Sequence, residues 1–283
     1  MAFCPGHITG FFIAREHDDP LMTGSMGAGM CISLGATSEV TVEEGDGIVV
    51  LIDGVEGGEV SRRAVEDLLE GRKLKVTVDT KLDLPPSQGF AMSAAGALSA
   101  CFALAHLLDI PFQRCFEAAH RAEVAAGTGL GDVAALHRGG ITLRRKEGLP
   151  PYGKVDRIPG STSLVLCVLG DPLETATVLA DEDVRKKLDL VGRRCMRSLE
   201  KRITLSNLFR ASREFANETG LMGAEVRAAL AALKSTGPAS MTMLGNSIFC
   251  SGELGEQERI LSAYGRTFRA EIDYDGPRVL DHS

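Results

Sequence analysis

Two side chains that could hold a metal ion, Ser93 and Glu123, lie on either side of a turn formed by Asp109-Ile110-Pro111. Proline cannot continue a helix but suits the first turn of one, so we expect helices over Ser93–Leu108 and Phe112–Ala126. Ser93 lies about 16 residues before the turn and Glu123 about 13 after it. At about 1.5 Å per residue, an antiparallel helix pair brings both residues to nearly the same height.

A third oxygen donor, Asp132, ends the glycine-rich segment Gly127-Thr-Gly-Leu-Gly-Asp132, just past the second helix. The chain therefore returns to the neighbourhood of Ser93 and Glu123. Mg²⁺ prefers oxygen ligands and keeps few protein ligands besides substrate phosphates. We expect the three side chains to converge where a phosphate would lie, with Ser93 and Glu123 supplying the minimum set for the metal.

The segment before the first helix has the features of a phosphate-binding loop. Leu84-Pro-Pro-Ser-Gln-Gly89-Phe-Ala-Met-Ser93 leads directly into an alanine-rich helix. A helix N-terminus presents free N–H groups and a partial positive charge, which suits a nucleotide phosphate. The expected ATP-binding residues are Gly89, Phe90, Ala91, Met92 and Ser93. Taken alone, Ser93 could equally be a simple N-cap.

The phase of the second helix indicates where Glu123 points. At about 100° per residue, one stripe carries Phe112, Phe116, Ala119 and Glu123, and the opposite face carries Arg114, Glu117 and Arg121. A carboxylate facing a core needs a cation or hydrogen-bond donors. The alternative is a solvated Glu123. His120 lies close to the same inner stripe, where it is either a ligand-binding or a structural histidine.

Two other nucleotide-binding motifs are excluded. Gly148–Val155 resembles a Walker A loop but ends in valine where serine or threonine should meet magnesium, and two prolines remove backbone donors. Gly24–Gly29 has its glycines in the wrong order for a dinucleotide fingerprint.

Composition favours a cytoplasmic protein with small-molecule partners. The chain has 283 residues, 44% of them apolar, which allows one large domain or two modest ones. A net charge of -7 argues against nucleic acid as partner. Seven cysteines are scattered without a C-x-x-C pair, as expected in a reducing cytosol. No apolar run reaches the roughly 18 residues of a membrane helix.

The order of elements predicts an α+β protein in two packed halves with an active-site cleft between them. The first half has expected strands at Met30–Leu34, Glu39–Glu43, Ile48–Ile52, Leu74–Val78 and Ile141–Arg145, and a helix at Ser61–Glu70. The Pro/Gly-rich Gly148–Gly160 is read as a linker, which gives an N-terminal domain of residues 1–155 and a C-terminal domain of residues 156–283. Further expected strands are Ser163–Leu169, Met241–Leu244, Ile248–Ser251 and Thr267–Ile272, with helices between Thr175 and Lys234 and around Glu256–Tyr264.

At these motifs the chain resembles the GHMP kinases, the superfamily of mevalonate, homoserine and galactose kinases. The likeness covers Pro5-Gly6-His7, the Gly89–Ala95 phosphate loop, the Gly129–Asp132 loop and Thr236–Gly245. It implies the two-domain GHMP kinase fold. The usual G-L-G-S-S-A-A is here G-F-A-M-S-A-A, and the third motif lacks its run of glycines.

Those departures resemble one subfamily, the archaeal pantoate kinases, which share the C-P-G-H-I-T-G-F-F start, a G-S-x-G-A-G segment and a G-P-A-S-M ending. The resemblance implies ATP-dependent phosphorylation of (R)-pantoate to 4-phosphopantoate in coenzyme A biosynthesis. It also implies that Ser93 and Glu123 hold Mg²⁺, that Asp132 orients or deprotonates the attacking hydroxyl, and that the acceptor site includes His120, Arg144 and Thr175.

The acceptor carboxylate asks for a cation or backbone N–H groups. Arg144 and the segment that begins at Ser25 are the candidates, although Arg144 could be a solvated strand end and Ser25 a turn residue. The alternatives for the whole chain are a GHMP kinase for homoserine or a mevalonate-like acid, and a non-catalytic ligand sensor. A homodimer is expected because it is the commonest assembly of soluble enzymes.

Overall fold

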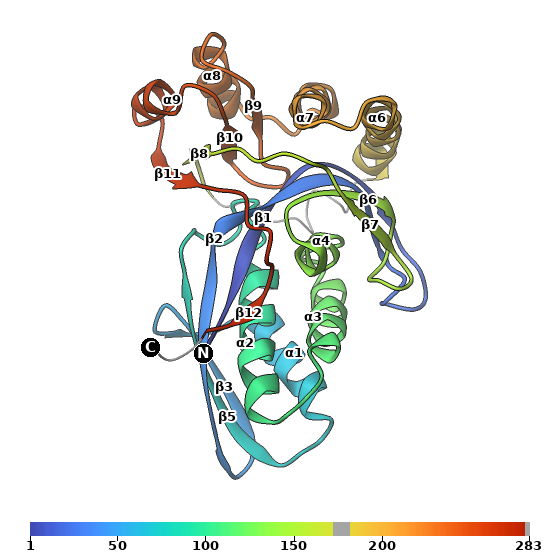
Figure 1. The fold of residues 1–283 in the computed structure, drawn as a ribbon, viewed down its shortest axis with the longest axis vertical. Helices are drawn as coiled ribbons and strands as arrows, with labels where there is room; N and C mark the ends of the chain where they lie inside the picture. The colour runs from blue at the N-terminus through green and yellow to red at the C-terminus, as the bar shows by residue number, and fades with distance from the viewer. Residues whose placement is uncertain (172–181, 281–283) are drawn as a thin grey trace.

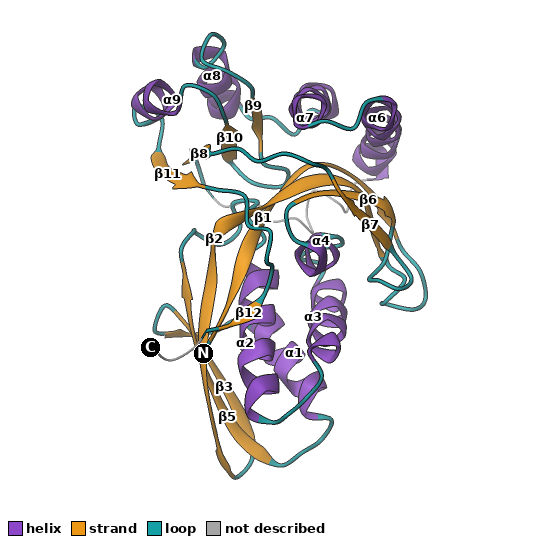
Figure 2. Cartoon of the chain, in the orientation of Figure 1, coloured by secondary structure: helices purple, strands orange, loops and turns teal. Residues whose placement is uncertain are grey.

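The computed structural model describes residues 1–171 and 182–280 and contains two β-sheets with helices packed on both (Figures 1 and 2). The larger sheet has the strand order β12-β1-β2-β5-β3-β4, and β6 joins it by pairing with β2 and β7. Its strands are β1 (Ala2–Arg15), β2 (Gly24–Glu44), β3 (Gly47–Ile52), β4 (Val55–Glu56), β5 (Leu74–Leu82), β6 (Ile141–Lys146), β7 (Lys154–Arg157) and β12 (Arg278–Val279).

Two long antiparallel strands, β1 and β2, form the centre of this sheet. β2 pairs with β6 through Gly27–Met30 and with β5 through Ala36–Glu44, so one strand links both wings. β1 is buried along nearly its whole length because helices pack on both its faces. Such a strand shows a near-continuous apolar run rather than alternation.

Three helices, α1 (Glu59–Leu69), α2 (Met92–Leu107) and α3 (Phe112–Ala126), pack against one another beside β1 and β2 (Figure 1). α2 is apolar on nearly every face, as expected for a helix enclosed between a sheet and two other helices. The short helix α4 (Asp132–Arg138) follows α3 and contacts both α2 and β1.

The second sheet has the order β11-β8-β10-β9 and lies at the other end of the molecule with the C-terminal helices (Figure 1). Its strands are β8 (Leu164–Val168), β9 (Ala239–Met241), β10 (Ser247–Cys250) and β11 (Arg266–Ala270), and the helices are α6 (Glu182–Lys201), α7 (Leu205–Thr219), α8 (Ala224–Ala232) and α9 (Leu254–Leu261). α6 and α7 also pack against β1, which joins the two halves. None of the helices in residues 1–171 and 182–280 is long and apolar enough to cross a membrane.

The α+β class is confirmed. The first 15 residues, for which no element was expected, contain β1, which tolerates Pro5-Gly6 through a register shift at that point. Two sequence expectations need correction. The expected strands at Met30–Leu34 and Glu39–Glu43 are parts of the single strand β2, because the intervening residues stay paired with β1 or β5. The expected linker contains β7, which pairs with β6. The domain boundary at residue 155, inside β7, stays a prediction.

Candidate active site

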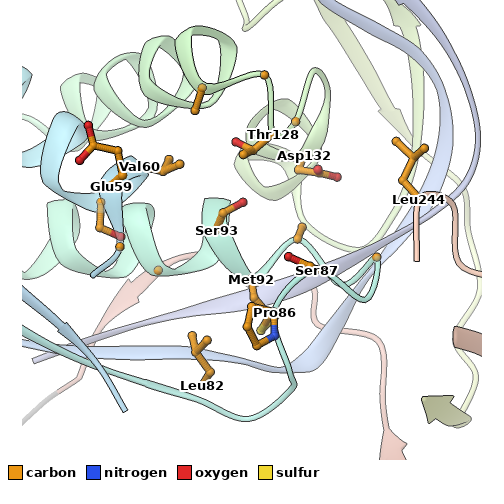
Figure 3. Close-up of a pocket in the computed structure, with 18 of the residues that line it drawn as sticks. Glu59, Val60, Leu82, Pro86, Ser87, Met92, Ser93, Thr128, Asp132 and Leu244 are labelled. Atoms are coloured by element: carbon orange, nitrogen blue, oxygen red, sulfur yellow. The ribbon is translucent and has the colours of Figure 1, made fainter. Parts of the chain in front are cut away.

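A cavity of about 680 Å³ opens between the two halves of the chain, as the expected cleft requires (Figure 3). Its walls come from β1, from the segment that begins α1, from the loop before α2, from the loop between α3 and α4, and from the tip of the β9–β10 hairpin. Ser93 and Asp132 both line it. The larger part of the wall belongs to the first half, and the second half contributes Met243 and Leu244.

The loop before α2 is held in an unusual backbone conformation. Gly89 has φ 80°, and Ala91, the residue before the helix, has φ 57° in the left-handed region. α2 begins at Met92, so the expectation that Ser93 could be an N-cap is wrong: it is a helical residue in the first turn. The free N–H groups of that turn therefore border the cavity. Phe90 does not line it but is buried behind the loop, where its carbonyl accepts a 3.0 Å hydrogen bond from the N–H of His7.

The second half of the chain braces this loop. The carbonyl of Gln88 accepts hydrogen bonds from the hydroxyls of Thr242, at 3.1 Å, and Ser247. A Cβ atom at Gly89 would lie 2.6 Å from Thr242 Oγ1 and 2.9 Å from the carbonyl oxygen of Met243, so only glycine fits between loop and hairpin. The conformation of this loop thus depends on contact between the two halves.

Glu123 is buried, with 1% of its surface exposed, and neither carboxylate oxygen has a hydrogen-bond partner among the described residues. Burial raises its pKa to about 8, although the nearby hydroxyls of Ser93 and Thr128 act in the opposite direction. An ionised carboxylate in such surroundings needs a cation. Ser93 and Glu123, on the antiparallel helices α2 and α3, therefore fit the ligand set expected for Mg²⁺.

The carboxylates of Glu123 and Asp132 lie close to each other beside Gly129. A Cβ atom at this position would lie 2.3 Å from Glu123 Oε2 and 2.9 Å from Asp132 Oδ2. Both carboxylates therefore occupy the space that a side chain at residue 129 would need. The convergence of Ser93, Glu123 and Asp132 predicted from helix geometry is present in the structure.

Asp132 has a different environment from Glu123. It is the first residue of α4, not a loop residue as the sequence indicated, and its Oδ1 lies 2.7 Å from Nδ1 of His7. Burial alone would raise its pKa, but the hydrogen bond from His7 and the positive charge of Arg144 hold the pKa below its usual value. Asp132 is thus kept ionised at the edge of the cavity (Figure 3).

Arg144 determines which nitrogen of His7 carries the proton. Its Nη1 lies 3.5 Å from His7 Nε2, and arginine can only donate, so Nε2 accepts and Nδ1–H donates to Asp132. Burial lowers the pKa of His7, which agrees with a neutral ring even though Asp132 opposes that shift. Arg144, His7 and Asp132 therefore form one directed chain of hydrogen bonds.

The expected acceptor-site residues divide into those at the wall and those behind it. Ser25 lines the cavity. Arg144 is fully buried behind Gly131, with Nε donating to the Ser25 carbonyl at 3.2 Å, so it is not a solvated strand end. His120 does not line the cavity: its Nε2 donates to the Thr23 carbonyl at 2.9 Å, which fits the structural alternative. Thr175 lies outside the described residues.

Sequence reasoning assigned no role to His7, Thr9, Thr128 or Leu244, although all four contact or line the site. His7 belongs to the Pro5-Gly6-His7 segment that carried the family resemblance. The other three had no recognisable signal in a single sequence.

We expect Glu123→Gln to stabilise the metal-free protein at pH 8. The pKa of Glu123 is higher in the folded state than in the unfolded state, so the folded protein binds this proton more tightly. The resulting contribution to the free energy of unfolding is fully present below the unfolded-state pKa near 4.5 and is lost as the pH rises to about 8. Glutamine has no proton to lose, so the variant should gain up to a few kcal/mol at pH 8, on the order of 1.4 per pKa unit, and little at pH 5. Thermal unfolding in chelator-treated buffer at both pH values measures this.

Glu39→Gln is the matched control, because it makes the same chemical change on an exposed position of β2. Added Mg²⁺ should raise the unfolding temperature of the parent at pH 8 more than that of Glu123→Gln. A parent protein that gains stability relative to Glu123→Gln between pH 5 and pH 8 would contradict the assignment of a buried, unpartnered carboxylate.

Comparison with known proteins identifies the family. Residues 59–140 match the model for the GHMP kinases N terminal domain. The chain is 34% identical to a pantoate kinase of Methanospirillum hungatei over 99% of this chain and 96% of that protein, and 34% identical to a pantoate kinase of Methanocaldococcus jannaschii over 96% of this chain and all of that protein.

A solved structure, described as a phosphotransferase related to the CoA biosynthesis pathway, superposes with a TM-score of 0.87 at 32% identity, covering 98% of this chain and 97% of that one. The fold is therefore the GHMP kinase fold. With relatives this similar along their full length, the chain belongs to the pantoate kinase family of the GHMP kinases.

Proposed function

We propose that this protein transfers the γ-phosphoryl group of ATP to the 4-hydroxyl of (R)-pantoate, giving 4-phosphopantoate and ADP, in coenzyme A biosynthesis. The observation that carries the proposal is an ionised Asp132 on the cavity wall with the buried carboxylate of Glu123 close behind it at Gly129, in a chain with full-length pantoate kinase relatives. Phosphoryl transfer requires mainly positioning and charge neutralisation, which such a site supplies.

Asp132 is the proposed proton acceptor. As the 4-hydroxyl oxygen of pantoate attacks the γ-phosphorus, its proton passes to a carboxylate oxygen of Asp132, and the bond from that phosphorus to the ADP oxygen breaks. His7 supports this step by donating to Oδ1, which keeps Asp132 ionised and fixes its orientation. Arg144 supports it from behind by fixing the tautomer of His7.

The phosphate end of the site is proposed to bind MgATP. Ser93 and Glu123 would hold Mg²⁺, which neutralises phosphate charge when bound. The N-terminal N–H groups of α2 face the same phosphates, and the left-handed Gly89 and Ala91 set their direction. With Glu123 bound to a cation, its ionised form is stabilised in spite of burial.

The pantoate carboxylate is proposed to bind near Ser25. Arg144 donates to the Ser25 carbonyl from behind the wall, so its charge favours an anion on the cavity side without a required direct contact. His120 holds the Thr23 carbonyl, two residues before Ser25, and so positions the start of β2. Thr175 stays a proposed acceptor-site residue.

The proposal also includes a cytoplasmic location and a homodimeric assembly. Light scattering of the purified protein tests the homodimer.

We expect pantoate to be the preferred acceptor in a coupled assay of ADP release with MgATP. Homoserine and mevalonate, acceptors of other GHMP kinases, should each show at least about tenfold lower kcat/KM, because a site fitted to one acceptor loses binding energy with another. Faster turnover of homoserine or mevalonate would reject pantoate as substrate. Binding of pantoate without any ADP release would instead favour the sensor alternative.

Substitution of the two carboxylates should have different effects on the kinetics and on MgATP binding. Asp132→Asn should lower kcat by on the order of 10²-fold or more while MgATP affinity changes little, because the proton acceptor acts mainly in the transition state. Glu123→Gln should lower the rate and also raise the Mg²⁺ concentration needed for half-maximal rate. Steady-state kinetics with calorimetric MgATP titration decides this. An Asp132→Asn protein that no longer binds MgATP would reverse the two assignments.

Removing the imidazole of His7 should change the pH dependence. In His7→Phe the donor to Asp132 is lost while burial remains, so the pKa of Asp132 rises and the acidic limb of kcat/KM moves to higher pH. The loss should be about tenfold or more at pH 6 and smaller at pH 8. His7→Gln, which keeps an N–H donor, should restore part of the profile. A loss of equal size at every pH would indicate that His7 only supports packing.

A further inference from the structure

Leu244 lies at the tip of the β9–β10 hairpin with φ 61°, in the left-handed region that leucine rarely adopts. Its side chain lines the active-site cavity, on the side of Asp132 away from Glu59 and Val60 (Figure 3). Glycine or asparagine would adopt this turn at lower cost. Strained backbone positions that persist at a functional site point to a role for the residue there. We therefore ask what the side chain of Leu244 contacts.

Hydrogen bonds place the hairpin tip directly beside the proposed proton acceptor. The N–H of Met243 donates to the Thr9 carbonyl at 3.0 Å, and the Thr9 hydroxyl lies 3.4 Å from Nδ1 of His7, the group that holds Asp132. On its other side the tip packs against Gly89 of the phosphate loop. Leu244 therefore follows a residue that contacts both the loop before α2 and the Thr9–His7 group that holds Asp132.

The cavity wall has both apolar and polar parts. Phe12 and Met243 line the cavity and are 5% and 3% exposed, and Leu244 adds a half-buried isobutyl group. The polar groups of the wall include those of Thr9, Ser25 and Asp132, which match the hydroxyl and carboxylate of a small hydroxy acid. The apolar part of the wall finds a complementary group only if the acceptor also carries hydrocarbon branches. A fully polar ligand would bury no apolar surface against it and would gain no hydrophobic binding energy there.

We propose that Leu244, backed by Phe12 and Met243, is a specificity residue that packs against the two methyl groups on the quaternary carbon of pantoate. The proposal rests on the function proposed above, since that carbon is bonded to the carbon that bears the reacting 4-hydroxyl. A wall at this point selects for a branched acceptor and disfavours one with a charged ammonium group, which would lose its hydration there.

The test compares pantoate with 2,4-dihydroxybutyrate, which is the same hydroxy acid without the two methyl groups. For the parent enzyme, kcat/KM should favour pantoate. In Leu244→Ala and Leu244→Asn the ratio of the two kcat/KM values should fall by roughly tenfold or more, the usual discrimination for one or two hydrocarbon groups in a pocket. Leu244→Asn tolerates the left-handed conformation, so it keeps the turn while removing the apolar surface.

Leu107→Ala is the matched control, because it removes the same atoms from an exposed leucine at the far end of α2. It should leave the ratio unchanged. Equal loss of activity on both acceptors in both Leu244 variants, with folding verified by thermal unfolding, would overturn the specificity role while leaving pantoate as substrate. A parent enzyme that prefers 2,4-dihydroxybutyrate would reject the specificity role and the proposed substrate together.

Discussion

The site is organised around a buried carboxylate that has the hydroxyls of Ser93 and Thr128 nearby but no hydrogen bond of normal geometry among the described residues. Glu123 is held at the end of α3 by the packing of α3 against the apolar helix α2, and neither of its oxygens is satisfied by the described protein. An uncompensated buried charge is among the costliest features a fold can contain. Such a cost is tolerated where a ligand relieves it, which supports the proposal that the helix pair binds a cation at Glu123.

A second carboxylate, that of Asp132, lies close to Glu123 in an opposite environment. Glu123 has a raised pKa and Asp132 a lowered one, although both approach Gly129. The difference comes from partners. Asp132 accepts a hydrogen bond from Nδ1–H of His7, whose other nitrogen accepts one from Arg144, whereas Glu123 lacks a comparable donor. Two carboxylates with divergent pKa values in one cleft can divide their roles between charge binding and proton transfer. The hairpin from the second half completes the cleft and braces the phosphate loop.

Local rules predicted the helices that carry the site, since α3 has the expected bounds and α2 begins one residue earlier than expected. The proline turn and the apolar stripe are properties of neighbouring residues, which a single sequence displays. The contact of His7 with Asp132 joins residues 125 positions apart, and it depends on the register of β1 and the place of α4, which no local pattern encodes. The burial of Phe90, which the sequence placed among the ATP-binding residues, and the place of Leu244 on the cavity wall were not predictable for the same reason: whether each faces core or cavity depends on the other half of the chain.

The most direct test is a crystal structure with Mg²⁺, a non-hydrolysable ATP analogue and pantoate bound. The account predicts the metal on the hydroxyl of Ser93 and the carboxylate of Glu123. It also predicts the pantoate 4-hydroxyl oxygen about 3 Å from Asp132, within reach of proton transfer. Asp132 bound to the metal, with Glu123 still unpartnered and the 4-hydroxyl outside hydrogen-bond distance of Asp132, would contradict it.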